Sequence, residues 1–225
     1  MTFTLRNLYE ADILQVSEIE REAFPTIWPR TSFKRDLTNR RISYLVAALL
    51  HPPEAVEEPE EEPIHPFLGR EPIPLRLIRN FRDRLWPQGV PHKPTNDTPL
   101  GFVSVWFITE EAHITAIAVK EAWRGQGLGE LLLIGAIETA MHRKSRVVTL
   151  EVRVSNVSAI SLYEKYSFKR VGTRKGYYTD NRESAGIMTT EPIHGLSYQQ
   201  RFSELREAYL KRRGSVEMSL KLASA

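Results

Sequence analysis

The sequence contains no cysteine among its 225 residues. Disulfide bridges, thiolate metal sites and a cysteine nucleophile are therefore excluded, and any covalent chemistry would need another side chain. No segment approaches the about 18 consecutive apolar residues of a membrane-spanning helix, and the N-terminus lacks a basic stretch followed by an apolar one. With 31 basic and 28 acidic side chains the net charge is only +3, which gives little support to nucleic-acid binding. These absences predict a soluble cytoplasmic protein with neither a membrane nor a nucleic-acid partner.

The histidines are few and scattered, and their spacing does not match that of a metal site. We interpret them as surface or loop groups, and the sequence predicts no bound metal. The six are His51, His65, His92, His113, His142 and His194.

The most informative segment is a glycine-rich turn, residues 124–129, which reads Arg-Gly-Gln-Gly-Leu-Gly. It follows an apolar strand-like segment, 114–119, and opens an apolar helix-like segment, 131–141. Glycine lets the backbone turn sharply, and the first turn of a helix has unpaired N–H groups, so such a turn attracts phosphate. The spacing fits neither a P-loop nor G-x-G-x-x-G, and takes the form Arg-x-x-Gly-x-Gly. The alternative is that the glycines only permit close packing of strand and helix.

A second strand and helix follow this turn. The run 147–154 is mostly apolar, with Glu151 and Arg153 as its charged residues, and a helical pattern begins after Ser155. With the glycine turn included, residues 114–168 resemble the core of the GNAT superfamily of acyl-CoA-dependent N-acetyltransferases. The segment Leu150-Glu151-Val152-Arg153-x-Ser155-Asn156-x-x-Ala159-Ile160-x-Leu162-Tyr163 resembles the bacterial ribosomal-protein alanine N-acetyltransferase family.

The resemblance covers residues 5–50 and 100–192. It implies an α/β fold of GNAT type, with a mixed, mostly antiparallel sheet, a central parallel strand pair and flanking helices. It also implies transfer of an acetyl group from acetyl-CoA, as cosubstrate, to the N-terminal α-amine of a protein or peptide, with a ribosomal protein as a candidate acceptor.

Two other functions stay open. One is the same chemistry on a small amine or a lysine side chain. The other is a CoA-binding or interaction module without turnover, against which the intact set of Glu151, Asn156 and Tyr163 argues. An α-amine with a pKa of about 7.7 to 8.0 is partly neutral at pH 7 and needs only a weak base, unlike lysine at about 10.4. The sequence does not determine the oligomeric state.

Glu151 is the expected general base, because a carboxylate in an apolar strand is well placed to accept the proton of the attacking amine. The alternative is an outward-facing residue paired with Arg153 or a helix. The resemblance assigns Tyr163 as the acid for the leaving thiolate, although it could be an ordinary buried tyrosine. A phenol at about 10 facing a thiol at about 8.5 makes this transfer uphill by roughly 2 kcal/mol. Asn156, seven residues earlier, shares the helix face of Tyr163 and is expected to contact the pantetheine.

The remaining site residues are also those that the resemblance implies. Two groups would surround the reacting atoms, one binding acetyl-CoA and one lining the peptide slot. The cofactor-binding residues are Ile117, Ala118, Val119, Arg124, Gly125, Gln126, Gly127, Leu128, Gly129, Glu130 and Asn156. The substrate-binding residues are Phe24, Trp28, Tyr177 and Tyr178.

The chain is expected to form one acetyltransferase domain, residues 1–192, interrupted at 51–99 and followed by a helical tail at 193–225. Eleven of the fourteen prolines fall in the interruption, and six glutamates crowd residues 54–62, so this part cannot supply core strands. Within it, Leu75–Trp86 has the pattern of an amphipathic basic helix. We expect this helix to dock on the core and hypothesise that it forms a partial lid over the acceptor slot, with a passive surface excursion as the alternative.

The periodicity predicts the remaining elements. Strands are expected at 4–8, 44–50, 100–108, 114–119, 147–154, 168–174 and 185–190. Helices are expected at 11–24, 31–39, 131–141, after 155, and at 197–213.

Overall fold

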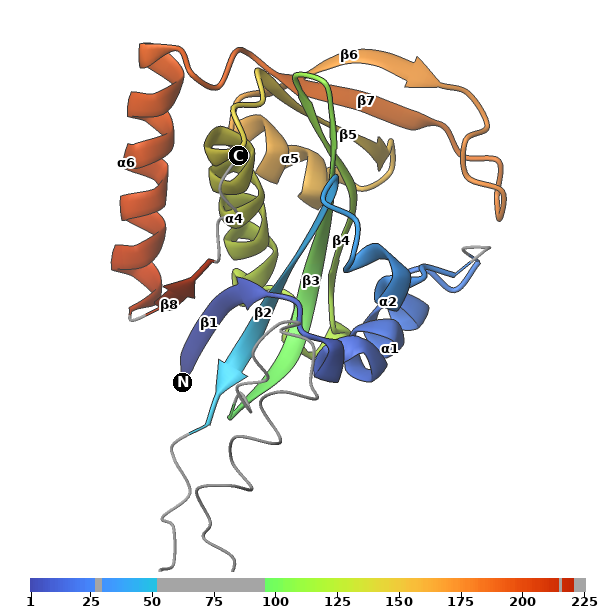
Figure 1. Ribbon diagram of the computed structural model, residues 1–225. Coiled ribbons are helices and arrows are strands. Elements are labelled where there is room, and N and C mark those ends of the chain that lie inside the picture. Colours follow the sequence, from blue (N-terminus) through green and yellow to red (C-terminus); the bar gives the residue numbers. More distant parts are fainter. Residues whose placement is uncertain (27–29, 52–95, 215, 221–225) are drawn as a thin grey trace, which may run out of the picture. The chain divides into compact units, whose positions relative to one another are not determined.

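The computed structural model of the chain describes residues 1–26, 30–51, 96–214 and 216–220. Two compact units make up the chain, residues 1–50 with 97–225 and residues 51–96. Nearly all of the second unit, including the predicted helix at 75–86, lies outside the described residues. The architecture visible in Figure 1 is therefore that of the first unit.

A sheet of eight strands in the order β6-β7-β5-β4-β3-β2-β1-β8 forms the centre of this unit. Neighbouring strands are antiparallel except for β4/β5 and β1/β8. The expected α/β fold with a mostly antiparallel sheet and a central parallel pair is confirmed. The strands are β1 Thr2–Asn7, β2 Ile42–Leu50, β3 Asp97–Ile108, β4 Glu111–Val119, β5 Val147–Arg153, β6 Phe168–Arg174, β7 Ala185–Thr190 and β8 Val216–Ser219.

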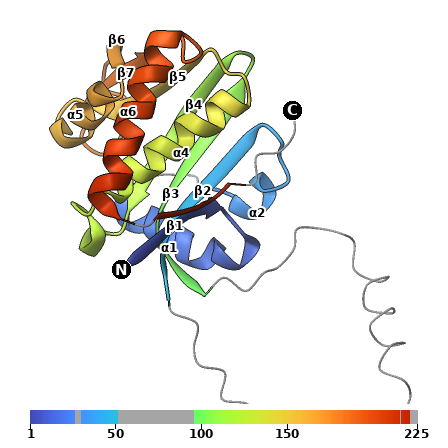
Figure 2. The same ribbon diagram turned by 90° about the vertical axis from the view of Figure 1, so that its left-hand side faces the viewer.

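Helices cover the sheet on both faces (Figure 2). One apolar cluster lies between the sheet and α4, α5 and α6, and a smaller one lies under α1 and α2 on the opposite face. The helices are α1 Ile13–Ala23, α2 Phe33–Asp36, α4 Leu128–His142, α5 Val157–Lys165 and α6 Leu196–Arg213, with short 3-10 turns at Glu10–Asp12 and Glu121–Trp123.

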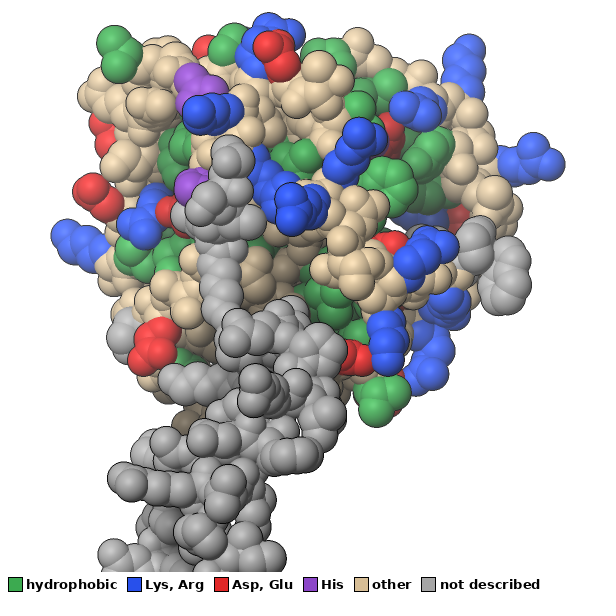
Figure 3. All heavy atoms as spheres, viewed as in Figure 1, with side chains coloured by type: hydrophobic (Ala, Val, Ile, Leu, Met, Phe, Trp, Pro, Cys, Tyr) green, Lys and Arg blue, Asp and Glu red, His purple; other side chains and the backbone are tan. Residues whose placement is uncertain are grey.

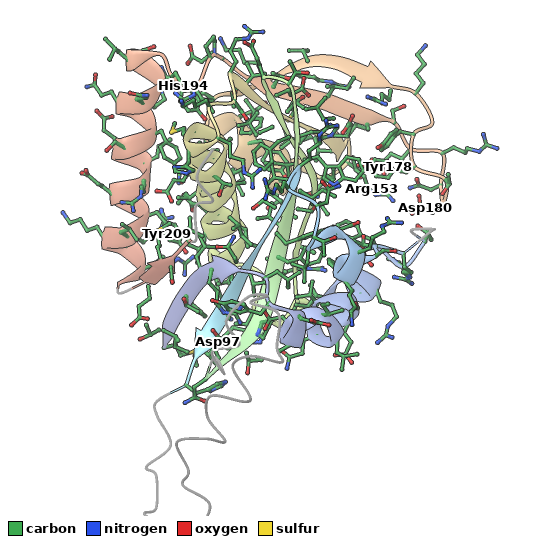
Figure 4. All side chains as sticks on the ribbon, viewed as in Figure 1. Asp97, Arg153, Tyr178, Asp180, His194 and Tyr209 are labelled. Carbon is green, nitrogen blue, oxygen red and sulfur yellow. The ribbon has the colours of Figure 1, made fainter. Side chains whose placement is uncertain are left out.

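Helix α4 is buried on nearly all sides. Leu131, Leu132, Leu133 and Ile137 are at most 1% exposed, although they point in different directions around the helix. A helix that is apolar all round needs cover on its outer side as well as on its sheet side. Helix α6 supplies that cover through apolar residues including Tyr209, which faces α4 in Figure 4.

The parallel strands β4 and β5 separate after a short pairing. Their register runs from Glu111 opposite Val147 to Ile114 opposite Leu150 and then stops, although β4 continues to Val119. A bulge at Thr115 accompanies the separation, because Ser104 faces Ala116 while Val105 faces Ile114. Residues 115–119 thus keep β3 as a partner but have no ladder to β5.

The insertion leaves the sheet between β2 and β3, where Leu50 faces Asp97. Residues 97–99 belong to β3, so the strand takes in the end of the segment expected to be an insertion. Pro99 fits because it lies beside a bulge opposite Ala47 and Ala48, where a missing N–H costs little. Buried Arg6 on β1 anchors this end through a pair at 2.5 Å to Asp97, which is labelled in Figure 4.

The C-terminal tail is part of the same compact unit as the sheet. Its helix was expected at 197–213 and runs over Leu196–Arg213. The tail was expected to be helical, and this expectation was incomplete, because Val216–Ser219 forms β8 and pairs in parallel with β1. Strand β8 has too few residues for its pattern to be read from sequence, and only its neighbour shows that it is a strand.

Candidate active site

The glycine turn has the backbone conformation that its sequence predicts. Gly125 and Gly127 have φ of 74° and 81°, a region that favours glycine, and Gly127 is the N-cap of α4. An added Cβ at Gly125 or Gly129 would meet nothing within 4 Å, so space is open beside both.

Several backbone N–H groups at this turn have no hydrogen-bond acceptor in the described part of the chain. Leu131 is the first residue of α4 whose N–H reaches a backbone carbonyl, that of Gly127 at 3.0 Å. Within the described part of the chain, the N–H groups of 125–130 donate to no other group. Free donors at a helix N-terminus with open space beside them fit a phosphate group.

The side chains flanking the turn are held by the protein itself. Arg124 is exposed, and its Nε donates to the carbonyl of Val119 at 3.3 Å. Glu130 was expected to contact the cofactor, but its side chain turns towards α5 and α6. Its carboxylate accepts from Lys165 at 2.5 Å, Tyr166 at 2.8 Å and Arg212 at 2.7 Å. These partners hold the pKa of Glu130 below its usual value against the opposing effect of burial, so only its backbone is free for a ligand.

The strand edge beside the turn is also open. Ile117, Ala118 and Val119 pair with Val103, Phe102 and Gly101 on β3, and the separation from β5 leaves their other edge without a ladder. Backbone groups on that edge fit the amides of a pantetheine arm, which is the arrangement the resemblance implied.

Glu151 lies on β5 beside the separated strands, and its side chain is 9% exposed. Nε2 of His113 on β4 donates to its carboxylate at 2.6 Å, and Nη2 of Arg174 on β6 lies 3.1 Å from the other oxygen. The expected alternative of a pair with Arg153 is not what the structure shows. Two partners leave further lone pairs of the carboxylate able to accept a proton.

His113 was interpreted as a surface or loop group, and that interpretation is wrong. It lies within β4, opposite Thr149 on β5, with a side chain 24% exposed. Neither its spacing nor its neighbours in sequence indicate the contact with Glu151, because the two residues are brought together only by the β4/β5 register. Arg174 was missed for the same reason.

Tyr163 is buried in the cluster under α5, and its ring centroid lies 5.7 Å from that of Phe168. Its hydroxyl donates to no group in the described part of the chain. Burial raises the pKa of Tyr163 to about 12, and Tyr178 adds to the rise. Complete proton transfer to a thiolate of pKa about 8.5 would thus cost about 5 kcal/mol, more than sequence alone predicts. Hydrogen-bond donation to the developing thiolate is the role that this pKa favours.

Tyr178, in the loop after β6, is partly buried. Burial raises its pKa to about 12, opposed by Arg153 and helped by Tyr177 and Glu151. Tyr178 in turn contributes to the raised pKa of Tyr163.

Asn156 caps α5. Its side-chain oxygen accepts from the N–H of Ala159 at 3.2 Å, so its amide NH₂ is the group left for a ligand.

Charged pairs hold the loop after β6, residues 175–184, against the end of β5. Arg153 lies 3.8 Å from the ring centroid of Tyr178 and pairs with Asp180 at 2.8 Å and Glu183 at 3.1 Å (Figure 4). Tyr177 is 45% exposed and meets Tyr178 edge to face at 5.2 Å.

Two further residues, Phe24 and Trp28, were expected to bind the substrate. Phe24 caps the end of α1 and packs against the cluster under α1 and α2. Trp28 lies outside the described residues. In the described ranges, no three metal-ligating side chains gather and no helix is long and apolar enough to cross a membrane.

Comparison with known proteins places this site in context. The model of the acetyltransferase (GNAT) family matches residues 13–168. A Bacillus subtilis protein assigned as a ribosomal protein bS18-alanine N-acetyltransferase is 47% identical over 88 residues, which are 39% of this chain and 58% of that protein. The chain thus spans less than two thirds of this relative.

Two further proteins match over most of their length. An N-alpha-acetyltransferase of Saccharolobus solfataricus is 28% identical over 81% of this chain and 89% of its own. The crystal structure of the ribosomal-protein-S18-alanine N-acetyltransferase from Escherichia coli matches with a TM-score of 0.57 and 25% identity, covering 85% of this chain and 94% of that one.

Proposed function

The chain belongs to the acetyltransferase (GNAT) family, and from this premise we propose that it transfers the acetyl group of acetyl-CoA to the N-terminal α-amine of a protein or peptide. The relatives carry names of this activity, two of them with the alanine of a ribosomal protein as acceptor. We therefore take an N-terminal alanine of a ribosomal protein, in the cytoplasm, as the first acceptor to test.

The observation that carries the proposal is the position of Glu151. Its carboxylate lies beside the point where β4 and β5 separate, held by His113 and Arg174. The glycine turn with its unpaired N–H groups follows β4, and Tyr163 of α5 is buried in the same apolar cluster as Leu150 and Val152 of β5. These positions support a phosphate-binding role for the turn, a proton-accepting role for Glu151 and a proton-donating role for Tyr163.

Each side chain has a defined role in this reaction. Acetyl-CoA, when bound, supplies an activated acetyl thioester. Glu151 accepts the proton of the amine as nitrogen bonds to the acetyl carbon, directly or through water, and His113 and Arg174 fix its orientation. The hydroxyl of Tyr163 donates a hydrogen bond to sulfur as the C–S bond breaks. The amide of Asn156 and the open edge of β4 would hold the pantetheine.

Arginine side chains on the acceptor side form ion pairs with carboxylates. Arg153 and Arg174 border the 175–184 loop, and Lys and Arg side chains are spread over the described part of the face shown in Figure 3. Arg153 pairs with Asp180 and Glu183, and Arg174 pairs with Glu151, so these cations balance the carboxylates of the acceptor side.

The test presents three acceptors to the purified chain with acetyl-CoA. They are a lysine-free peptide beginning with alanine, the same peptide with a blocked N-terminus and one internal lysine, and spermidine. Mass spectrometry of the products should show acetylation of the first peptide alone, and the Glu151→Gln variant should lose it. Transfer only to lysine or spermidine, or binding of acetyl-CoA without turnover on any acceptor, would contradict the proposal.

A further inference from the structure

Arg213, the last residue of α6, lies directly on the glycine turn. An ideal Cβ at Gly127 would come within 2.6 Å of its Nε and 2.9 Å of its Cζ, and its Nη2 is 3.4 Å from the carbonyl of Gly125. Figure 2 shows why: α6 runs alongside α4 in the opposite direction, so that its C-terminal end lies beside the start of α4. The guanidinium therefore borders the segment that we expect to bind phosphate.

Two hydrogen-bond donors at the end of α6 have no acceptor in the described part of the chain. Nε of Arg213 and the hydroxyl of Tyr209, one helical turn earlier, are buried side-chain atoms without a hydrogen-bond partner in the described part of the chain. Burial raises the pKa of Tyr209 to about 12, and the nearby charge of Arg213 opposes the rise. The neighbouring Arg212 is different, because it pairs with Glu130 at 2.7 Å. Unpaired buried donors are costly, and the N–H groups of 125–130 are also unpaired, so this place lacks an acceptor that an anion would supply.

The charge at the end of α6 also matches an anion. A helix C-terminus carries partial negative charge and would repel a phosphate beside it. The sequence of α6 ends in Arg213, whose positive charge lies on the turn and reverses that effect. This sequence lies beyond residues 13–168, the part that the family model matches.

We propose that Arg213 binds the diphosphate of acetyl-CoA, so that the C-terminal helix completes a cosubstrate site begun by the glycine turn. A guanidinium can present two parallel N–H groups to a phosphate, and here it starts from a position packed on the turn. The inference rests on the proposed function and adds to it a binding residue supplied by the tail.

The experiment measures dissociation constants by calorimetry for CoA, dephospho-CoA and pantetheine. Dephospho-CoA keeps the diphosphate but lacks the 3′-phosphate, and pantetheine has neither. Arg213→Gln should weaken CoA and dephospho-CoA alike by about tenfold and leave pantetheine unchanged. Lys211→Gln removes the same charge from an exposed position on the same turn and should change none of the three. Arg213→Lys keeps the aliphatic chain and the charge but not the two parallel N–H groups of the guanidinium, so its affinity for CoA and dephospho-CoA should fall severalfold.

The outcomes separate this proposal from the proposed function. If the unaltered protein binds neither CoA nor dephospho-CoA, both are wrong. If it binds them and Arg213→Gln does so equally well, or no worse than Lys211→Gln, Arg213 is not a ligand. A loss confined to CoA would move the contact to the 3′-phosphate and overturn the diphosphate assignment. Thermal melting of each variant without ligand verifies folding, and Arg213→Lys decides the question if Arg213→Gln does not fold.

Discussion

The proposed cosubstrate side and the proposed acceptor side of this site are built from different kinds of group. The cosubstrate side consists mainly of backbone: the N–H groups of 125–130, the open edge of β4 and the N-terminus of α4. The acceptor side consists of charged and aromatic side chains from three strands and the 175–184 loop, centred on Glu151.

This difference explains why the residues of one side can be predicted from the sequence and those of the other cannot. A backbone site requires glycine at defined positions, and these follow one another along the chain. A side-chain site combines residues such as His113, Glu151 and Arg174, which are far apart in sequence and meet only through strand register. We therefore expect changes on the acceptor side to affect turnover and changes on the cosubstrate side to affect binding.

The largest effect should come from Glu151→Gln. Loss of the proton acceptor should lower kcat about 100-fold while the KM for acetyl-CoA stays near its original value. Part of the loss should be recovered as pH rises through about 8, because more of the α-amine is then neutral. Steady-state kinetics across pH tests this, with Glu164→Gln on the exposed side of α5 as control. Equal turnover of Glu151→Gln and the original protein at pH 7 would remove Glu151 from the mechanism.

A second effect, on binding, should follow from Gly127→Val. The side chain would have to adopt a φ of 81° and would collide with Arg213, so affinity for acetyl-CoA should fall at least about tenfold. Calorimetry provides the measurement, and melting curves report the accompanying loss of stability.

Gly129→Ala tests whether a ligand approaches the backbone of this turn closely, without the backbone strain that a side chain at Gly127 introduces. Gly129 has open space beside it and no unusual φ, so alanine should leave the fold intact. Weaker binding of acetyl-CoA by this variant would then report a ligand close to the backbone. Unchanged affinity in both variants would show that the turn does not bind phosphate.

The smallest effect concerns the loop on the acceptor side. Hydrogen bonds from Ser155, followed by Arg153 and Asn181, lower the pKa of Glu183 to about 2. A carboxylate with a pKa lower in the folded than in the unfolded state stabilises the fold above about pH 4.5, and this contribution disappears as pH falls towards 2. The melting temperature of Glu183→Gln should therefore lie slightly below that of the original protein at pH 6 and converge with it near pH 2.

The control for this comparison is Glu110→Gln. Glu110 makes an exposed pair with Arg146 at 3.5 Å, a kind of contact that contributes little. Its melting temperature should match that of the original protein throughout. A difference for Glu183→Gln that stays constant from pH 6 to pH 2 would contradict the role of the ionised carboxylate.

Periodicity predicted most of the elements correctly, with β6 and β7 matching at both ends and most others within a few residues. The glycine spacing also predicted a sharp turn at the start of α4, which Gly125 and Gly127 make with positive φ. Glu151 and Tyr163 could be named because they lie within a contiguous motif, although their catalytic roles stay predictions. The raised pKa of Tyr163 was not predictable, because it depends on burial under α5.

The sequence by itself determined the fold class, the glycine turn and the identity of the motif residues, because each depends on neighbours along the chain. Only the tertiary structure decided that His113 and Arg174 hold Glu151, that Glu130 turns to α6, and that the tail adds β8 and brings Arg213 to the turn. These contacts join residues separated by whole elements. Their geometry follows from strand register and helix packing, which no local pattern encodes.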